Sequence, residues 1–114
     1  MPESSESRSL RFCYPEELHT KAIALLDAIE QAADPTQHSK ALGDVVVQLT
    51  NSGLRYYFLK PLTLANAGFF SQQSAQFGVA SAVNIMSPLI RTAIGLLDKA
   101  QLVVIAGFIR SLMV

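Results

Sequence analysis

The sequence has little of what small domains use for cross-linking, and little charge. Its 114 residues include one cysteine and no tryptophan, and Asp, Glu, Lys and Arg make up 16% of the chain, against about 25% in typical soluble domains. Cys13 cannot form an intramolecular disulfide, whereas small secreted domains usually contain several. The serine-rich and acidic N-terminus has no apolar segment of the kind found in secretory signal peptides. We therefore expect a cytoplasmic protein.

The chain also lacks net charge, because nine Lys and Arg balance nine Asp and Glu. Without a basic excess there is no field to attract phosphate groups, so we expect no nucleic-acid partner. None of the charged side chains lies between Pro61 and Ile90. This segment is long enough to span a bilayer, but five polar residues interrupt it: Asn66, Gln72, Gln73, Gln76 and Asn84. We predict that it does not span a membrane.

The length allows one folded domain, because two stable cores rarely fit in so short a chain. Half of the residues belong to the hydrophobic set, which excludes disorder of the whole chain. The first residues are rich in serine and glutamate and show no periodicity. We predict a disordered N-terminal tail over residues 1–13 and a single helical domain over residues 14–114.

Apolar residues recur at helical spacing and predict helices at about 15–33, 37–59, 62–86 and 88–112. Pro15 is typical of a helix start, whereas Pro35 and Pro61 predict helix ends. Ser87 and Pro88 fit either the start of a fourth helix or a kink in one helix that joins the last two. Short connections between helices favour antiparallel neighbours. The predicted fold is an all-α, antiparallel four-helix up-down bundle.

The third predicted helix has a line of small side chains at spacings of three and four residues: Gly68, Ser71, Ala75, Gly78 and Ala82. We call these five residues the small-residue line. Such a line allows another helix backbone to approach closely. The pattern therefore predicts a tight helix crossing.

The last two predicted helices contain more apolar residues than a bundle of this length can bury. Because an exposed apolar patch promotes aggregation, we predict an obligate homodimer. Its interface comprises the small-residue line together with Val104 and Phe108. The corresponding function is a non-catalytic interaction or scaffolding module, which binds itself and leaves room for a further protein partner.

Aromatic residues gather on both sides of the predicted helix end at Pro61: Tyr56, Tyr57, Phe58, Phe69 and Phe70. One interpretation is that they close an end of the bundle as core. The other is an apolar pocket or docking patch, in which tyrosine hydroxyls orient a ligand and Arg55 faces an acidic head group. The second interpretation predicts a binder of an apolar ligand or a membrane surface, which also uses the C-terminal helix. Its binding residues would be Arg55, Tyr56, Tyr57, Phe69 and Phe70.

The histidines lack the neighbours that metal or phosphate chemistry requires. Glu16 and His19 have the spacing that dimetal four-helix proteins use twice, but only one copy occurs here. The segment that begins at His38 resembles the His-x-Leu-Lys-Gly pattern of histidine phosphotransfer domains. However, Lys40 and Gly43 follow that histidine at the wrong spacing. We expect no metal site and no phosphate relay.

No catalytic motif is present elsewhere in the sequence. Cys13 has no neighbour, as far as the sequence shows, that would lower its pKa and make it reactive. The glycine-rich nucleotide loops and the strand-turn-helix nucleophile motif are also missing. We therefore expect no catalytic residues, no cofactor and no enzymatic activity.

Overall fold

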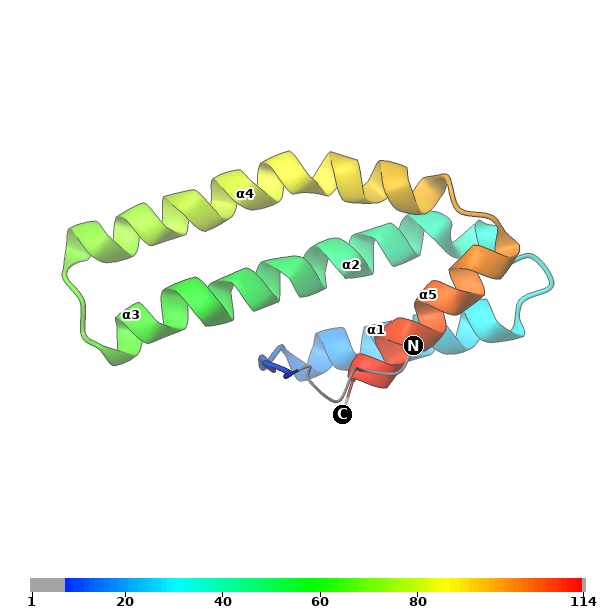
Figure 1. Ribbon diagram of the computed structural model, residues 1–114, viewed down its shortest axis with the longest axis horizontal. Helices are drawn as coiled ribbons and strands as arrows, with labels where there is room; N and C mark the ends of the chain where they lie inside the picture. The colour runs from blue at the N-terminus through cyan, green and yellow to red at the C-terminus, as the bar shows by residue number, and fades with distance from the viewer. Residues whose placement is uncertain (1–7, 114) are drawn as a thin grey trace.

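The computed structural model describes residues 8–113, in which all regular secondary structure is helical and no strand occurs. The predicted all-α class is confirmed. The helices, labelled in Figure 1, are α1 (Glu16–Gln31), the 3-10 helix η1 (Pro35–His38), α2 (Ser39–Leu54), the π-helix η2 (Arg55–Leu59), α3 (Lys60–Leu64), α4 (Phe69–Gly95) and α5 (Lys99–Leu112).

The segments α2, η2 and α3 follow one another without a break, and the next helix begins at Phe69. The helix end predicted at residue 59 and the helix start predicted at residue 62 are therefore both wrong. The Lys60 N–H donates to the carbonyl of Arg55, five residues earlier, which is the bond of a π-helix. A proline in a regular α-helix lacks its N–H, and its ring collides with the carbonyl four residues before it. The wider π turn directly before Pro61 relieves that collision, and the helix continues to Leu64.

A second correction concerns the last two predicted helices. Pro88 lies inside α4, and the break in the chain falls later, between Gly95 and Lys99. The predicted boundary between residues 86 and 88 is therefore wrong, and Pro88 is an interior proline of the helix. The Ser87 hydroxyl donates to the carbonyl of Val83 at 2.6 Å.

The start of α5 carries a capping box that the sequence analysis missed. The Asp98 carboxylate accepts the Gln101 backbone N–H at 2.8 Å, and the Gln101 side-chain oxygen accepts the Asp98 backbone N–H at 2.9 Å. Each residue thereby satisfies a donor that the first turn of a helix leaves without a partner. This pair fixes where α5 begins.

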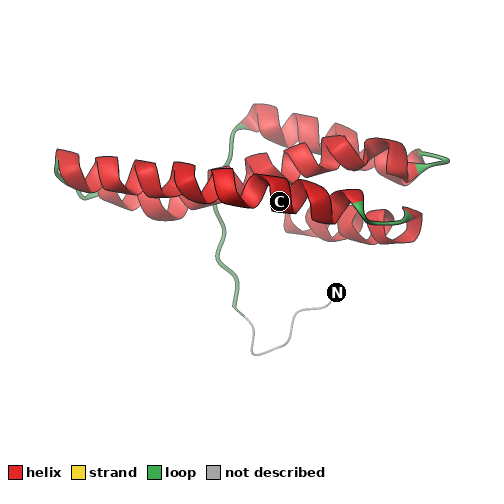
Figure 2. Cartoon of the chain, turned by 90° about the horizontal axis from the view of Figure 1, so that it is seen from above, coloured by secondary structure: helices red, strands yellow, loops and turns green. Residues whose placement is uncertain are grey.

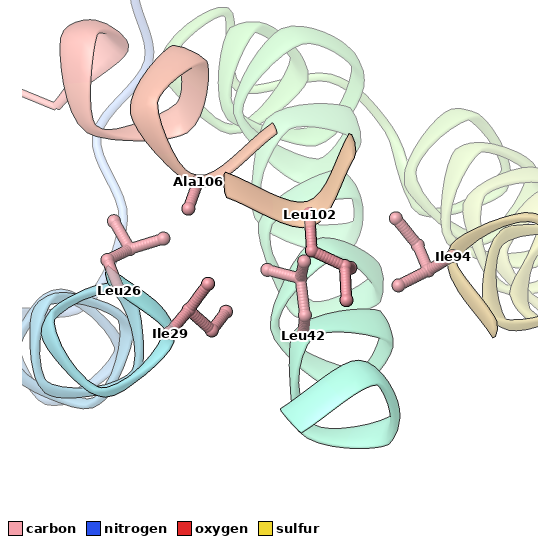
Figure 3. Packing of buried hydrophobic residues seen from close by; sticks show 6 residues of the cluster. All are labelled: Leu26, Ile29, Leu42, Ile94, Leu102 and Ala106. Atoms are coloured by element: carbon pink, nitrogen blue, oxygen red, sulfur yellow. The ribbon is translucent and has the colours of Figure 1, made fainter. Parts of the chain in front are cut away.

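The helices form a long hairpin with a core at one end. The continuous α2–α3 helix and α4 run side by side, while α1 and α5 pack near one end of them (Figures 1 and 2). Six residues from all of these helices meet there, as Figure 3 shows: Leu26, Ile29, Leu42, Ile94, Leu102 and Ala106. We call this region the core end. The opposite part of the hairpin, residues 55–80, is the distal half and consists of two helices.

The shape is elongated as a result. The radius of gyration is 16.0 Å, against about 13 Å for a compact chain of this length, and the extents are 52 × 34 × 26 Å. Successive helices reverse direction in Figure 1, but α1 and α5 leave the distal half uncovered. A regular four-helix up-down bundle is therefore not established within the single chain.

The predicted division into tail and domain stays a prediction. Residues 1–7 of the predicted tail lie outside the described residues. Residues 8–13 have no helix, and the half-buried Phe12 packs its ring against Gly53 and Tyr57.

Candidate self-association surface

The side of α4 that faces away from α2 carries a row of large apolar side chains. Phe77, Ile85, Leu89 and Leu96 are between 66% and 80% exposed. Their spacing places them on one side of the helix, and we call them the α4 stripe. On the other side Val79 and Ile94 are buried against the core end and the paired helix. Such an extended exposed apolar row is a candidate interaction surface.

The small-residue line runs beside this stripe. Gly68, Ser71 and Gly78 are exposed, while Ala75 and Ala82 are half-buried. A Cβ built on Gly68 or Gly78 would meet no atom within 4 Å. The tight crossing that the line predicts is therefore not made to another helix of the same chain, and the line stays open along most of its length.

A close approach of two helices within the chain occurs instead at Gly43, which the sequence analysis did not select. Gly43 is buried in α2, and a Cβ there would lie 3.5 Å from the Cα of Arg91 in α4. The sequence contains a weak signal for it, because a glycine inside a helical apolar pattern often has a packing reason. Only its neighbour across the hairpin shows what this glycine does.

The two predicted interface residues of the last helix are exposed, Val104 at 69% and Phe108 at 44%. They lie on α5, which diverges from α4 after Asp98 and packs against α1 (Figure 1). The structure therefore does not place these two residues in the same row as the α4 stripe.

The aromatic residues do not form a core plug, so that interpretation is wrong. Phe69 is 71% exposed and Phe70 is 84% exposed, because no third helix covers the distal half. Their rings contact each other, with centroids 5.9 Å apart. The half-buried Tyr56 and the exposed Tyr57 form a second pair, with centroids 5.8 Å apart. The side chains of Arg55 and Lys60 flank this pair; Lys60 Nζ lies 5.1 Å from the centre of the Tyr56 ring.

Two cavities among the described residues lie away from these aromatics. One, of about 350 Å³, is lined by Thr36, Gln37, Ser39, Lys40, Gly43, Arg91 and Gly95. The other, of about 330 Å³, is lined by Pro15, Glu17, Leu18, Lys21, Gln48, Asn51 and Ser52. Neither contains the residues predicted to bind a ligand, and both are open to solvent rather than enclosed.

The ion pairs of the described residues belong to the core end. Arg110 in α5 binds Asp27 and Glu30 of α1, and these carboxylates raise the pKa of Arg110, with the hydrogen bond to Glu30 as the largest cause. Arg91 pairs with Asp44 across the hairpin. Between Asp44 and Asp98 the sequence contains no acidic residue. The distal half therefore carries only cations.

The candidate chemical groups stay apart from one another. The Tyr14 hydroxyl lies 2.9 Å from His19 Nδ1, and burial raises the pKa of Tyr14. Asp34 accepts hydrogen bonds from the Thr36 hydroxyl and backbone N–H, and the hydroxyl is the main cause of its lowered pKa. Cys13 is exposed. Within residues 8–113, no group of three His, Cys, Asp or Glu side chains gathers in a metal-binding arrangement.

The prediction that the segment from Pro61 to Ile90 does not span a membrane stays a prediction. The helix α4 is long and apolar enough to cross a bilayer by length and composition alone, and little of it is buried. The sequence analysis ended its segment at Ile90, whereas the helix continues past Pro88 to Gly95 and gains further apolar residues. No known protein family, curated protein or solved structure matches the chain.

Proposed function

We propose that the protein is a non-catalytic interaction or scaffolding module that acts as an obligate homodimer through the outward side of α4. The exposed α4 stripe is the observation that supports this function. A stable interface buries about 800 Å² or more on each partner, and the exposed α4 stripe provides large apolar side chains for one.

A second copy of the chain can pack on this surface without electrostatic repulsion. No charged side chain occurs from Pro61 to Ile90, so two copies that face each other there bring no like charges together. The shape of the surface supports the same partner, because the large side chain of Phe77 lies next to Gly78 and the small Ser81. A surface with both projections and gaps can match itself across a two-fold axis.

The dimer would also complete the predicted architecture. Two helices alone cannot enclose a core, whereas four can. If the hairpins of two copies pack through their α4 stripes, the α2–α3 and α4 helices of both copies form a four-helix bundle with neighbouring helices antiparallel. The up-down bundle is then a property of the dimer rather than of one chain.

The charges of α2 weigh against α4 as a membrane span. α2 and η2 run alongside α4 and carry Lys40, Asp44 and Arg55. Insertion of the hairpin would place these side chains at membrane depth, at a cost of about 3 kcal/mol for each charge near the bilayer centre. Self-association covers the stripe without that cost.

The test is a charge placed on the stripe. In Phe77→Glu, two copies would bring like charges together at a buried contact, which costs several kcal/mol, so we expect the dissociation constant to rise about 100-fold or more. Sedimentation equilibrium at micromolar concentration measures this change. Because Phe77 is 75% exposed in the single chain, the variant should stay folded. Its helix content, measured by far-ultraviolet circular dichroism, should equal that of the wild type.

Gln76→Glu is the matched control, because it adds the same charge to an exposed position about 100° around the helix from Phe77, on a different side of α4. It should leave the dissociation constant within a few fold of the wild-type value. A wild-type particle of about 12 kDa at micromolar concentration would overturn the proposal, and so would equal weakening by the two substitutions.

A further inference from the structure

The end of the hairpin is an exposed apolar tip. Phe58, Leu64, Phe69 and Phe70 are between 59% and 84% exposed and flank the connection from α3 to α4, at the left end of the molecule in Figure 1. We call these four residues the hairpin tip. They are separate from the residues of the α4 stripe, and the connection from α3 to α4 lies at the end of the molecule opposite the core end.

The end of α3 at the tip is closed by backbone hydrogen bonds. The Ala67 N–H donates to the Leu62 carbonyl at 2.9 Å and the Asn66 N–H donates to the Thr63 carbonyl at 3.1 Å, with Asn66 in the left-handed region at φ 54°. This is the Schellman arrangement that closes a helix end. The Gln72 side chain donates to the Ala67 carbonyl at 2.8 Å. These bonds fix the connection that holds the apolar side chains of the tip at the end of the hairpin.

The charges near the tip have one sign. Arg55 and Lys60 lie within a few turns of it, and no acidic residue occurs between Asp44 and Asp98. The described acidic residues belong to α1, the connection to α2, the first turns of α2 and the start of α5. Tyr57, which is 39% exposed, adds a side chain of the type enriched at membrane interfaces. Aromatic and aliphatic groups flanked by cations match an anionic lipid surface.

We propose that the hairpin tip docks on the surface of a membrane that contains anionic phospholipids. The four tip side chains insert at the boundary between head groups and acyl chains, and Arg55 and Lys60 face the head-group phosphates. The part of the molecule that contains the described acidic residues stays away from the surface. This inference goes beyond the proposed dimer and needs only one chain.

Cosedimentation of the full chain with vesicles tests the docking. We expect the protein to pellet with vesicles of equal parts phosphatidylglycerol and phosphatidylcholine, and to bind pure phosphatidylcholine at least tenfold more weakly. The double substitution Phe69→Ser with Phe70→Ser should reduce binding to the mixed vesicles at least tenfold. Both side chains are more than 70% exposed, so circular dichroism should show an unchanged helix content.

Leu10→Ser with Leu112→Ser is the matched control, since it removes two exposed apolar side chains outside both the tip and the α4 stripe, and it should bind the mixed vesicles as the wild type does. Arg55→Gln with Lys60→Gln should abolish the preference for the anionic vesicles. Wild-type protein that stays in the supernatant, equal binding to both vesicle types, or equal loss in the Leu10→Ser and Leu112→Ser control would each overturn the docking.

The outcome is separable from that of the proposed dimer. Sedimentation equilibrium without vesicles should show the same association for the tip variants as for the wild type. A dimer that ignores vesicles overturns the docking alone, and a monomer that binds them overturns the dimer alone. Weaker self-association of the tip variants would show that a second copy covers the tip, which would overturn the docking.

Discussion

Two helical glycines show how the same residue acts differently in different surroundings. Gly43 lets α4 approach α2, because a Cβ there would lie in contact with the Arg91 backbone. Gly78 has open space around it. A glycine in a helix costs about 1 kcal/mol relative to alanine, so each position needs a reason outside the helix. For Gly43 the reason lies within the chain, and for Gly78 our proposal places it in a second copy.

We predict that Gly78→Leu weakens the dimer and leaves the single chain folded. The new side chain meets no atom of its own chain within 4 Å at Cβ, but it would overpack a close contact between copies, at a typical cost of about 1 to 3 kcal/mol. The dissociation constant from sedimentation equilibrium should therefore rise about 5- to 150-fold. Gln73→Leu should be nearly silent, and equal effects of the two substitutions would show that the interface lies on another side of α4.

The elements illustrate which local signals decide a helix boundary. Ser87 with Pro88 has the composition of a helix start, yet it lies inside α4. Asp98 with Gln101 forms the reciprocal cap that begins α5. The difference is that the second pair satisfies backbone N–H groups at a true helix start, whereas inside α4 the Ser87 hydroxyl bonds back to Val83.

We predict that Asp98→Ala destabilises the protein by about 1 kcal/mol, the usual cost of losing an N-terminal cap. The helix that it starts contributes Leu102 and Ala106 to the core, so urea denaturation followed by circular dichroism should detect the change. Lys99→Ala, one residue later on the exposed surface, is the control and should have little effect. A larger loss for Ser87→Ala than for Asp98→Ala would contradict this account of the boundary.

At the scale of the whole molecule, apolar burial and charge are both unevenly distributed. The buried cluster around Leu26, Leu42 and Leu102 lies at the core end, together with the described acidic residues. The distal half exposes large apolar side chains and carries only cations. A single chain is therefore well packed at one end only. The stability of the other end depends on the partner that covers its apolar side chains.

We predict that hydrogen exchange follows this division. At low protein concentration, the amides of residues 55–80 should exchange faster than those around Leu42 and Leu102, because local opening is easiest where few apolar contacts are buried. Protection of the distal half should rise with protein concentration as the dimer forms. Amides near Leu26 serve as the internal control and should not respond. Distal protection that is independent of concentration would count against self-association through α4.

The sequence by itself determined the all-α class, the first helix and the surplus of apolar residues. Leu18, Ala22 and Ile29 repeat at helical spacing and are buried in the structure, because periodicity is a local property that sequence records directly. The apolar excess of the C-terminal half is likewise a matter of composition, and the exposed stripe and tip are its consequence.

Only the tertiary structure decided where the helices end and what they pack against. Neither Pro61 nor Pro88 ends its helix, because a π turn precedes the first and the second lies in a long helix paired with α2. The helix α5 packs against α1 and does not run along α4. A proline's local cost is a few kcal/mol, and contacts between residues far apart in the chain can exceed it. Those contacts depend on the positions of all the helices together, which no local pattern contains.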